Sequence, residues 1–299
     1  MHWQKLGRLF EPAGQAAWIA SHAALPWAVP LHGDTFRVYC AGRDVQGRSQ
    51  VGIVELDLFN PVGARVLREP VLALGTLGAF DDNGVMNACL LHEGERDYLY
   101  YVGMTTGGTV PFRSFTGLAT SEDGLKFVRT SPSPILERDA VDPYLTAASF
   151  VLRDGERWHM WYTSGVRWAM EDRRPKHYYH IKYASSSNGI DWERSGSVCI
   201  DFQPGEYAIA RPFVVKENGV FKMWYSYRGD AYRIGYAESD DGIAWDRKDR
   251  EAGIDVSPSG WDSEMVCYAS VFDHGGERYM LYNGNGYGKT GFGLARLAH

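Results

Sequence analysis

The 299-residue sequence has few cysteines and no long apolar run. Its four cysteines, Cys40, Cys89, Cys199 and Cys267, are scattered without C-x-x-C spacing, which favours buried, reduced thiols over a disulfide framework. No apolar stretch approaches the length of a membrane span, and the N-terminus lacks the apolar core of a signal peptide. We therefore expect a cytoplasmic protein with no membrane partner.

The charge and the apolar periodicity of the sequence argue against further classes of partner and of fold. The net charge is −6 and there is no block of Lys or Arg, which argues against a nucleic-acid partner. No segment keeps a 3.6-residue apolar period, so a helical or α/β protein is not expected. No linker rich in Pro, Gly and Ser and no low-complexity segment interrupts the chain, which favours one domain over residues 1–299. No feature indicates an oligomeric state.

The sequence does contain a repeat. An apolar or aromatic residue followed by Tyr recurs five times at nearly even spacing, and a Gly follows each of these pairs within four positions. The intervals between these repeated tyrosines are 62, 61, 63 and 57 residues, and the residues are Tyr39, Tyr101, Tyr162, Tyr225 and Tyr282. A nearly fixed period of this size indicates a repeat architecture.

Each repeat consists of short aromatic and β-branched runs separated by turn signals. In the third repeat, runs 147–152 and 158–162 flank a charged turn, and run 181–185 precedes Asn188-Gly189. Such runs are typical of antiparallel hairpins. Four strands in each of five repeats predict an all-β fold, namely a five-bladed β-propeller with four antiparallel strands per blade.

The last repeat supplies only three runs, and the N-terminus supplies a candidate for the fourth. Residues 3–7 (Trp-Gln-Lys-Leu-Gly) resemble residues 192–196 (Trp-Glu-Arg-Ser-Gly), which hold the fourth-strand position of their repeat. We expect residues 2–10 to complete the last blade, so that the ring closes without an exposed strand edge.

Four carboxylates are in phase with the repeat. They lie 18 to 20 residues before a repeated tyrosine and are Asp82, Asp142, Glu206 and Glu264. In a propeller the innermost strands start on the face where the loops between second and third strands rise, so we expect these groups to converge on one funnel. A shared structural role is the alternative, because a single Asp near a strand start is usually a turn or capping residue.

The chain resembles the five-bladed propeller glycoside hydrolases, which include families 43, 32, 68 and 130. The resemblance covers the whole chain and rests on the aromatic-Tyr strand, on the turn at 183–192 and on the Asp-Pro step at Asp142. Families 43 and 32 place Asp, Asp and Glu at the innermost strand starts of three successive blades. Here the match is displaced by one blade, because the first repeat has no acid there.

The resemblance implies a role for each acid. Asp82 would be the base or nucleophile, Asp142 would orient the sugar ring or tune the pKa of the acid, and Glu206 would be the general acid. Cleavage of a glycosidic bond needs one carboxylic acid and one carboxylate on opposite sides of the anomeric carbon. The resemblance thus implies carboxylate acid-base chemistry in the funnel.

Basic and aromatic residues in the predicted rim loops form a second signal, and the longest of these loops spans residues 165–180. Arg suits a carboxylate or phosphate because its fork binds two oxygens. We expect substrate binding by side chains from all five repeats: His22, Trp27, Asn83, Arg113, His177, Arg211, Arg228, Tyr232, Glu264 and Tyr268. The alternative is that these arginines pair with nearby Asp and Glu.

Together these features predict a carbohydrate-active enzyme, either a glycoside hydrolase or a related glycosyl-transferring enzyme. Its substrate would be a small sugar or sugar-derived molecule that is acidic, phosphorylated or nucleotide-linked. Two alternatives stay open: a non-catalytic sugar-binding propeller, and a non-hydrolytic enzyme acting on a sugar-like metabolite. We expect no cofactor and no metal, because the His177-Tyr-Tyr-His180 segment lacks the spacing of a zinc motif.

Overall fold

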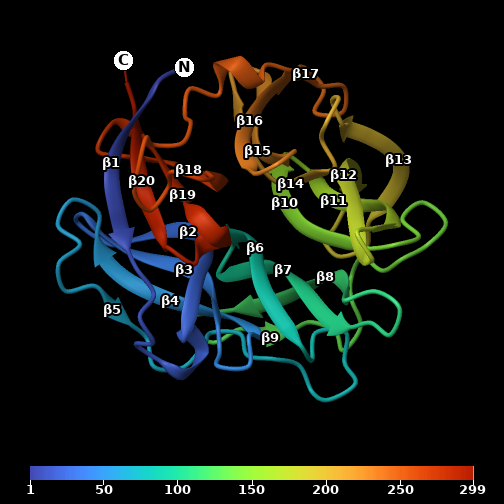
Figure 1. The fold of residues 1–299 in the computed structure, drawn as a ribbon, viewed down its shortest axis with the longest axis horizontal. Helices are drawn as coiled ribbons and strands as arrows, with labels where there is room; N and C mark the ends of the chain where they lie inside the picture. Colours follow the sequence, from blue (N-terminus) through green and yellow to red (C-terminus); the bar gives the residue numbers. More distant parts are fainter. Residues whose placement is uncertain (299) are drawn as a thin grey trace.

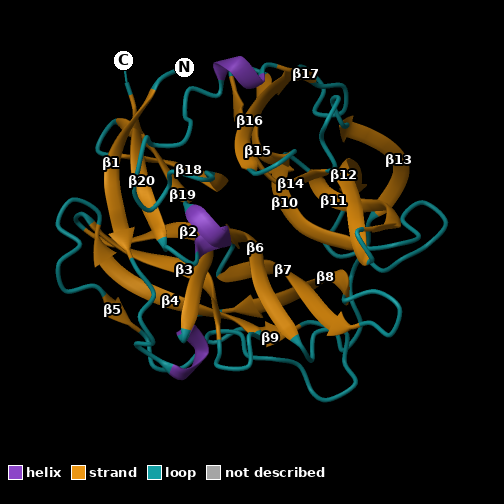
Figure 2. Ribbon diagram, viewed as in Figure 1, coloured by secondary structure: helices purple, strands orange, loops and turns teal. Residues whose placement is uncertain are grey.

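The computed structural model describes residues 1–298, and nearly all of its regular structure is antiparallel β-strand (Figure 2). Helix within these residues is confined to three short segments, η1 (Ala17–Ile19), η2 (Asp249–Glu251) and α1 (Asn285–Gly288). The all-β class predicted from the sequence is therefore confirmed. No helix within residues 1–298 has the length and apolar character needed to cross a membrane.

The strands of residues 1–298 fall into five sets of four. Set 1 is an antiparallel sheet made of β2 (Ser21–His32), β3 (Thr35–Arg43), β4 (Ser49–Asp57) and β5 (Arg65–Val66). Set 2 is a separate antiparallel sheet made of β6 (Gly84–Glu93), β7 (Arg96–Thr106), β8 (Phe112–Ser121) and β9 (Val128–Arg129). Set 3 contains β10 (Thr146–Asp154), β11 (Arg157–Glu171), β12 (Arg174–Ser186) and β13 (Glu193–Ile200). Set 4 contains β14 (Ala208–Glu217), β15 (Val220–Arg228), β16 (Tyr232–Ser239) and β17 (Asp246–Arg247). One parallel pair, Tyr179 with Ala208, joins sets 3 and 4 into a single sheet.

Set 5 combines the two ends of the chain. It consists of β18 (Cys267–His274), β19 (Glu277–Asn283), β20 (Phe292–Leu297) and β1 (Trp3–Phe10). β1 pairs antiparallel with β20, from Trp3 opposite Leu297 to Phe10 opposite Phe292, and Figure 1 shows the two strands side by side. The predicted pairing of the N-terminal residues with the last repeat is confirmed.

The five sets contact one another in sequence order, and set 5 returns to contact set 1 through β18 and β2. Their first strands meet near the middle of the molecule. Trp27 of β2, Phe150 of β10 and Phe213 of β14 pack with ring centroids 4.8 to 5.9 Å apart. The repeated tyrosines lie in the second strands and are all buried, as are the four free cysteines.

One expected loop is a hairpin instead. Residues 165–180 were expected to be a long rim loop, but β11 extends to Glu171 and β12 begins at Arg174. Asp172 and Arg173 have φ of 47° and 62°, the left-handed values of a tight two-residue hairpin turn. Aromatic residues pair across the two strands, as Trp168 does with His177, and this pairing extends the sheet beyond the other sets.

Candidate functional site

The first strand of every set is irregular at the same place. A register shift interrupts the pairing in β2, β6, β10, β14 and β18. The residue 14 positions before the repeated tyrosine lies within the interruption in four sets (Leu25, Ala148, Arg211 and Tyr268) and directly before it in β6 (Asn87). A β-bulge bends its strand and redirects a side chain.

Four of these residues have a strained backbone. The φ values of Leu25, Ala148, Arg211 and Tyr268 are 57°, 37°, 56° and 61°. A non-glycine residue in this region costs on the order of 1–3 kcal/mol, and such residues concentrate at functional sites. All four line one pocket, which the bulges therefore help to shape.

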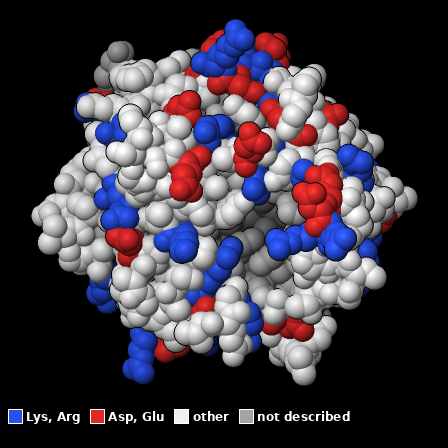
Figure 3. All heavy atoms as spheres, viewed as in Figure 1, with Lys and Arg blue, Asp and Glu red and all other residues white. Residues whose placement is uncertain are grey.

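This pocket, here called the arginine pocket, has a volume of about 300 Å³. It is lined by the first strands of the sets together with the ends of second strands and the beginnings of third strands. These segments thus meet at one pocket. Figure 3 shows a hollow near the middle of this face with Lys and Arg side chains at its edge. The volume lies at the small end of the range for small-molecule sites, roughly 300–1,000 Å³.

Three arginines line the pocket: Arg43 at the end of β3, Arg211 in β14 and Arg228 at the end of β15. Among residues 1–298, no Asp, Glu or Lys contributes to the lining. None of the three arginines forms an ion pair with a carboxylate of residues 1–298. Their positive charge is therefore not neutralised within the described chain.

Arg211 is 1% exposed. Its Nη1 atom donates to the carbonyl oxygen of Ala88, and its guanidinium lies 5.5 Å from the centroid of the Trp27 ring. Its Nε and Nη2 atoms have no hydrogen-bond partner among the described residues. Burial lowers the pKa of Arg211 from its ordinary value to about 10, so the side chain stays charged at neutral pH. A buried charge without a partner costs several kcal/mol and calls for an explanation.

Further side chains of the lining also have unused polar atoms. Arg228 lies over the rings of Tyr207, Tyr232 and Tyr287 at 5.4 to 5.6 Å, and its Nε atom is unpartnered within residues 1–298. The hydroxyls of Ser114 and Thr163 are buried without a partner there as well. Buried polar groups in proteins are usually hydrogen-bonded, so this concentration indicates a ligand site.

His177 and two tyrosines form one wall of the pocket. The ring of His177 stacks on Tyr179 with centroids 4.9 Å apart and an interplanar angle of 3°, and the hydroxyls of Tyr179 and Tyr232 share a hydrogen bond. Burial, with the nearby charges of Arg228 and Lys176, lowers the pKa of His177 to about 4. Burial raises the pKa of Tyr179 to about 12. Both groups are therefore neutral at pH 7.

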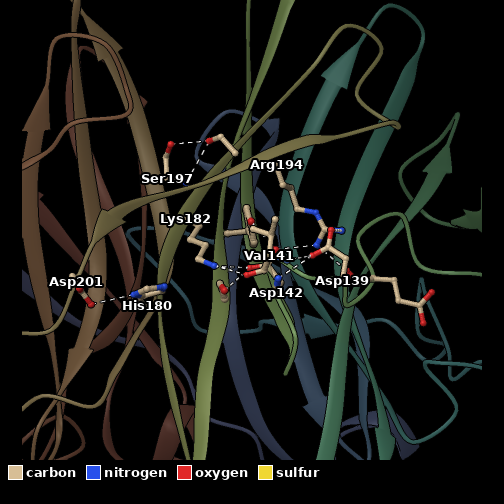
Figure 4. Close-up of polar contacts among 12 residues, drawn as sticks. Asp139, Val141, Asp142, His180, Lys182, Arg194, Ser197 and Asp201 are labelled. Carbon is tan, nitrogen blue, oxygen red and sulfur yellow. Dashed lines mark hydrogen bonds and ion pairs between the residues drawn. The ribbon is translucent and has the colours of Figure 1, made fainter.

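The acids expected to meet in the funnel do not line the pocket. Asp142 is fully buried and accepts hydrogen bonds from Tyr162 (2.9 Å), Ser164 (2.5 Å), Lys182 (3.1 Å) and Arg194 (2.9 Å). Figure 4 shows it between Lys182 and Arg194. Burial acts to raise its pKa, but the Ser164 hydrogen bond and the charge of Lys182 hold the pKa below the ordinary value. Asp142 thus links three strands of set 3.

Asp82, Glu206 and Glu264 also lie apart from the pocket. Asp82 is half-buried and accepts from the backbone nitrogen of Gly78 at 3.0 Å. Glu206 forms an ion pair with Arg247, with two contacts of 2.9 Å. Glu264 is exposed and has no hydrogen bond or ion pair through its carboxylate among the described residues. The expected ring of four carboxylates in one funnel is not what the structure shows.

A repeated structural contact uses aspartates at a fixed position, and Asp142 is the one of the four predicted acids that takes part in it. In three sets an Asp lies 20 residues before the repeated tyrosine and accepts from its hydroxyl at 2.9 to 3.0 Å: Asp81, Asp142 and Asp262. Each also binds a cation from the fourth strand of its set, at 2.6 to 2.9 Å: Arg129, Arg194 and Lys5. For Asp142 this geometry favours the structural alternative, whereas Asp81 and Asp262 were not among the four predicted acids.

The substrate-binding residues predicted from the sequence divide into two groups. The first group lines the pocket: His177, Arg211, Arg228, Tyr232 and Tyr268. The second group does not: His22, Trp27, Asn83, Arg113 and Glu264. Within the second group, Trp27 contacts the guanidinium of Arg211, and burial, with the charges of Arg43 and Lys289, lowers the pKa of His22 to about 4.

The predicted set omitted several residues that line the pocket: Arg43, Tyr179, Tyr287, Leu25, Met86 and Met104. The signal for some of them was present in the repeat. Counting 14 residues back from the repeated tyrosine finds a residue that lines the pocket in four of the five sets, whereas counting 20 back finds the structural aspartates in three of them.

Comparison with known proteins places the chain in a family. No protein-family model matches it. The Mycobacterium tuberculosis H37Rv protein Rv1502, described only as uncharacterized, is 44% identical over 301 residues, which cover 99% of both chains. This chain belongs to the Rv1502 family. A 1,2-beta-oligomannan phosphorylase from Thermoanaerobacter sp. X514 is 27% identical over 207 residues, covering 68% of this chain and 64% of that protein.

Solved structures extend the likeness at the level of the fold. A glycoside hydrolase superposes with a TM-score of 0.78 at 19% identity, covering 99% of this chain and 92% of that one. A thermostable family-43 glycoside hydrolase superposes with a TM-score of 0.67 at 17% identity, covering 93% and 90%. The predicted resemblance to propeller glycoside hydrolases is confirmed as a likeness of fold, without assignment to one numbered family.

Proposed function

We propose that this member of the Rv1502 family is a carbohydrate-active enzyme that binds the negatively charged group of a sugar in the arginine pocket. The glycoside hydrolases that share the fold and the phosphorylase relative support carbohydrate chemistry. Arg211 supports the negative charge, because its buried guanidinium has two unpartnered nitrogens in a pocket lined by no carboxylate. This unpaired buried cation is the observation that carries the proposal.

We interpret the five sets of strands as the blades of a five-bladed propeller that forms one domain over residues 1–299. The contacts between successive sets, the return of set 5 to set 1 and the five equivalent register shifts support this interpretation. On this interpretation the arginine pocket lies at one end of the central axis, where a propeller commonly binds its ligand.

The reaction we propose is glycosyl transfer to water or to phosphate. A hydrogen phosphate ion held by arginines brings its own anionic oxygen as nucleophile. That oxygen bonds to the anomeric carbon as the glycosidic C–O bond breaks, and the leaving sugar oxygen takes the proton of the phosphate, so the step needs no carboxylate base. A pocket without carboxylates suits such a reaction, and the name of the phosphorylase relative favours it. The acid and base roles of Asp82, Asp142 and Glu206 stay predictions, and the ion pairs of Asp142 and Glu206 favour structural roles for these two.

A second candidate is a sugar-binding protein without catalysis. The observation that favours it is the same absence of Asp and Glu from the lining, since cleavage of a glycosidic bond ordinarily uses a pair of carboxyl groups. Under this candidate the pocket binds an anionic sugar and releases it unchanged.

Matched ligand pairs test the proposal. Calorimetry at low ionic strength compares glucuronic acid and glucose 6-phosphate with neutral glucose, using the wild type, Arg211→Met and Arg113→Met. We expect the anionic sugars to bind more tightly, Arg211→Met to lose this preference, and Arg113→Met to keep it, because Arg113 is exposed and outside the pocket. Equal affinity for neutral and anionic sugars would refute an anionic substrate.

Turnover separates the two candidates. Mass spectrometry of a panel of anionic glycosides, with and without inorganic phosphate, detects hydrolysis and phosphorolysis as different products. Binding without any product across the panel favours the sugar-binding protein. If turnover is found, Glu206→Gln should leave it within a few-fold of the wild type when Glu206 is structural, whereas a loss of most turnover restores its predicted role as the acid.

A further inference from the structure

We infer that the arginine pocket contains an apolar subsite, so that its ligand carries an aryl or alkyl group beside its negative charge. The inference deepens the proposed function, because it concerns the same pocket and the class of substrate that fits it. It rests on how the lining residues are distributed among the sets of strands.

The larger apolar side chains of the lining gather in set 2. Met86 of β6, Val102 and Met104 of β7 and Phe112 of β8 line the pocket, and Leu145, just before β10, continues this surface. Ser114 is the single polar residue that set 2 contributes to the lining within residues 1–298. The three arginines come from sets 1 and 4, so the apolar surface of set 2 carries no charged side chain among the described lining residues.

Such a surface disfavours a fully hydroxylated sugar. Each sugar hydroxyl that leaves water needs a new hydrogen-bond partner, and thioethers and hydrocarbon side chains provide almost none. An aryl or alkyl group in the same place gains free energy in proportion to the apolar area that it removes from water. Methionine side chains adapt their shape to such groups. The chemistry of set 2 therefore selects an apolar substituent.

Arg211 fixes the other end of the ligand. Its guanidinium is held by the carbonyl oxygen of Ala88, which belongs to β6, the same strand as Met86. The buried cation is thus anchored to the set that contributes the apolar surface, within a pocket of about 300 Å³. A ligand of matching chemistry places a phosphate or carboxylate near Arg211 and its apolar group against Met86 and Met104.

Two pairs of probes test this ligand class. Calorimetry compares inorganic phosphate with phenyl phosphate, and glucuronic acid with phenyl β-glucuronide. We expect the phenyl group to tighten binding at least tenfold in both pairs. Met104→Gln should reduce that gain to threefold or less while changing the affinity for inorganic phosphate by less than twofold. Met170→Gln is the matched control, since Met170 is exposed and outside the pocket.

The outcomes separate the inference from the proposed function. If phenyl phosphate gains affinity over phosphate in a Met104-dependent way while no sugar binds, the apolar subsite stands and the sugar substrate fails. If anionic sugars bind but the phenyl group adds less than threefold, or its gain survives in folded Met104→Gln and Met86→Gln variants, the subsite is refuted. Failure of all four probes to bind the folded wild type also overturns it.

Discussion

Arg211 is a buried cation without a counter-ion in a strained backbone conformation. An uncompensated buried charge carries a desolvation penalty of several kcal/mol, which an apolar side chain of similar volume removes. We expect Arg211→Met to raise the free energy of unfolding of the ligand-free protein by about 1–3 kcal/mol while abolishing anion binding. Urea unfolding and calorimetry measure the two effects, and Arg113→Met should change neither. A large loss of stability on Arg211→Met would mean that the cation has a structural partner.

Asp142 is the opposite case, a buried anion with two cationic partners and two hydroxyl donors. Asp142→Asn leaves Lys182 and Arg194 with a neutral partner in a buried site. Removing one member of a buried ion pair costs about 3–5 kcal/mol, and we expect a loss of that size. Asp82→Asn should cost less than about 1 kcal/mol, since it weakens one hydrogen bond to a half-buried group. Thermal and urea unfolding of both variants check this difference.

His177 predicts a dependence of stability on pH. Its pKa in the folded protein is about 4, because of burial and then the charges of Arg228 and Lys176, against 6.5 when unfolded. As pH falls from 6.5 towards 4, the unfolded state therefore binds a proton that the folded state does not, and stability is lost. We expect the urea midpoint to fall between pH 7 and pH 5 and to fall less in His177→Gln. An unchanged pH dependence in that variant would exclude His177 as a source.

The residue-level predictions show what a repeat reveals and what it conceals. The period located the acids near the strand starts, and Asp142 lies in the expected phase. It did not reveal that the phenolic hydroxyl of Tyr162 faces this acid, because a buried hydrogen bond between residues 20 positions apart leaves no local pattern. The position that faces the pocket depends on a bulge, and a bulge at Leu25 or Ala148 has no Gly to mark it.

At the scale of the element, β1 is the strand that joins the two ends of the chain. Trp3 is buried and packs edge-on against Trp224 at 6.2 Å, and Lys5 forms an ion pair with the buried Asp262 at 2.6 Å. Deleting residues 1–10 removes these contacts and leaves β20 as an open edge. We expect a cooperative loss of stability of more than about 3 kcal/mol, which exceeds the effect of ordinary point variants.

Leu6→Gln serves as the matched control for this deletion, since Leu6 lies in β1 but is exposed. Its thermal transition should stay close to that of the wild type. Circular dichroism and thermal unfolding of the deletion compare the whole protein with the control. A deletion that unfolds with the same midpoint as the intact chain would show that β1 does not contribute to closure.

The existence of strands and hairpins was easier to predict from the sequence than the residues at which they end. Turn signals such as Asn188-Gly189 and the echo of the fourth strand at residues 3–7 identified hairpins and the pairing of β1 with β20. The extent of β11 and β12 was missed, because the turn at Asp172 and Arg173 contains no Gly to mark its left-handed conformation. The pairing that extends this hairpin depends on aromatic side chains, which also occur in loops.

At the scale of the whole molecule, two opposite charges act on an anionic ligand. The net charge of the chain is −6, whereas the arginine pocket contains three cations and no carboxylate in its lining. Electrostatic interactions extend over about 30 Å at 0.01 M salt but only about 8 Å at 0.15 M. At low salt an approaching anion therefore senses the repulsive net charge, and at higher salt it senses mainly the pocket.

The opposite signs of the net charge and the pocket charge predict an unusual salt dependence of the association rate. We expect the association rate constant of a dianion such as phenyl phosphate to increase between 0.01 and 0.15 M NaCl, because salt screens the long-range repulsion first. An exposed cationic patch on a neutral or basic protein gives the reverse, a rate that falls with salt. Stopped-flow measurement of tyrosine and tryptophan fluorescence gives this rate, and Arg211→Met shows which signal belongs to the pocket. An association rate that falls steadily over the same range would mean that surface cations, and not the buried pocket, attract the ligand.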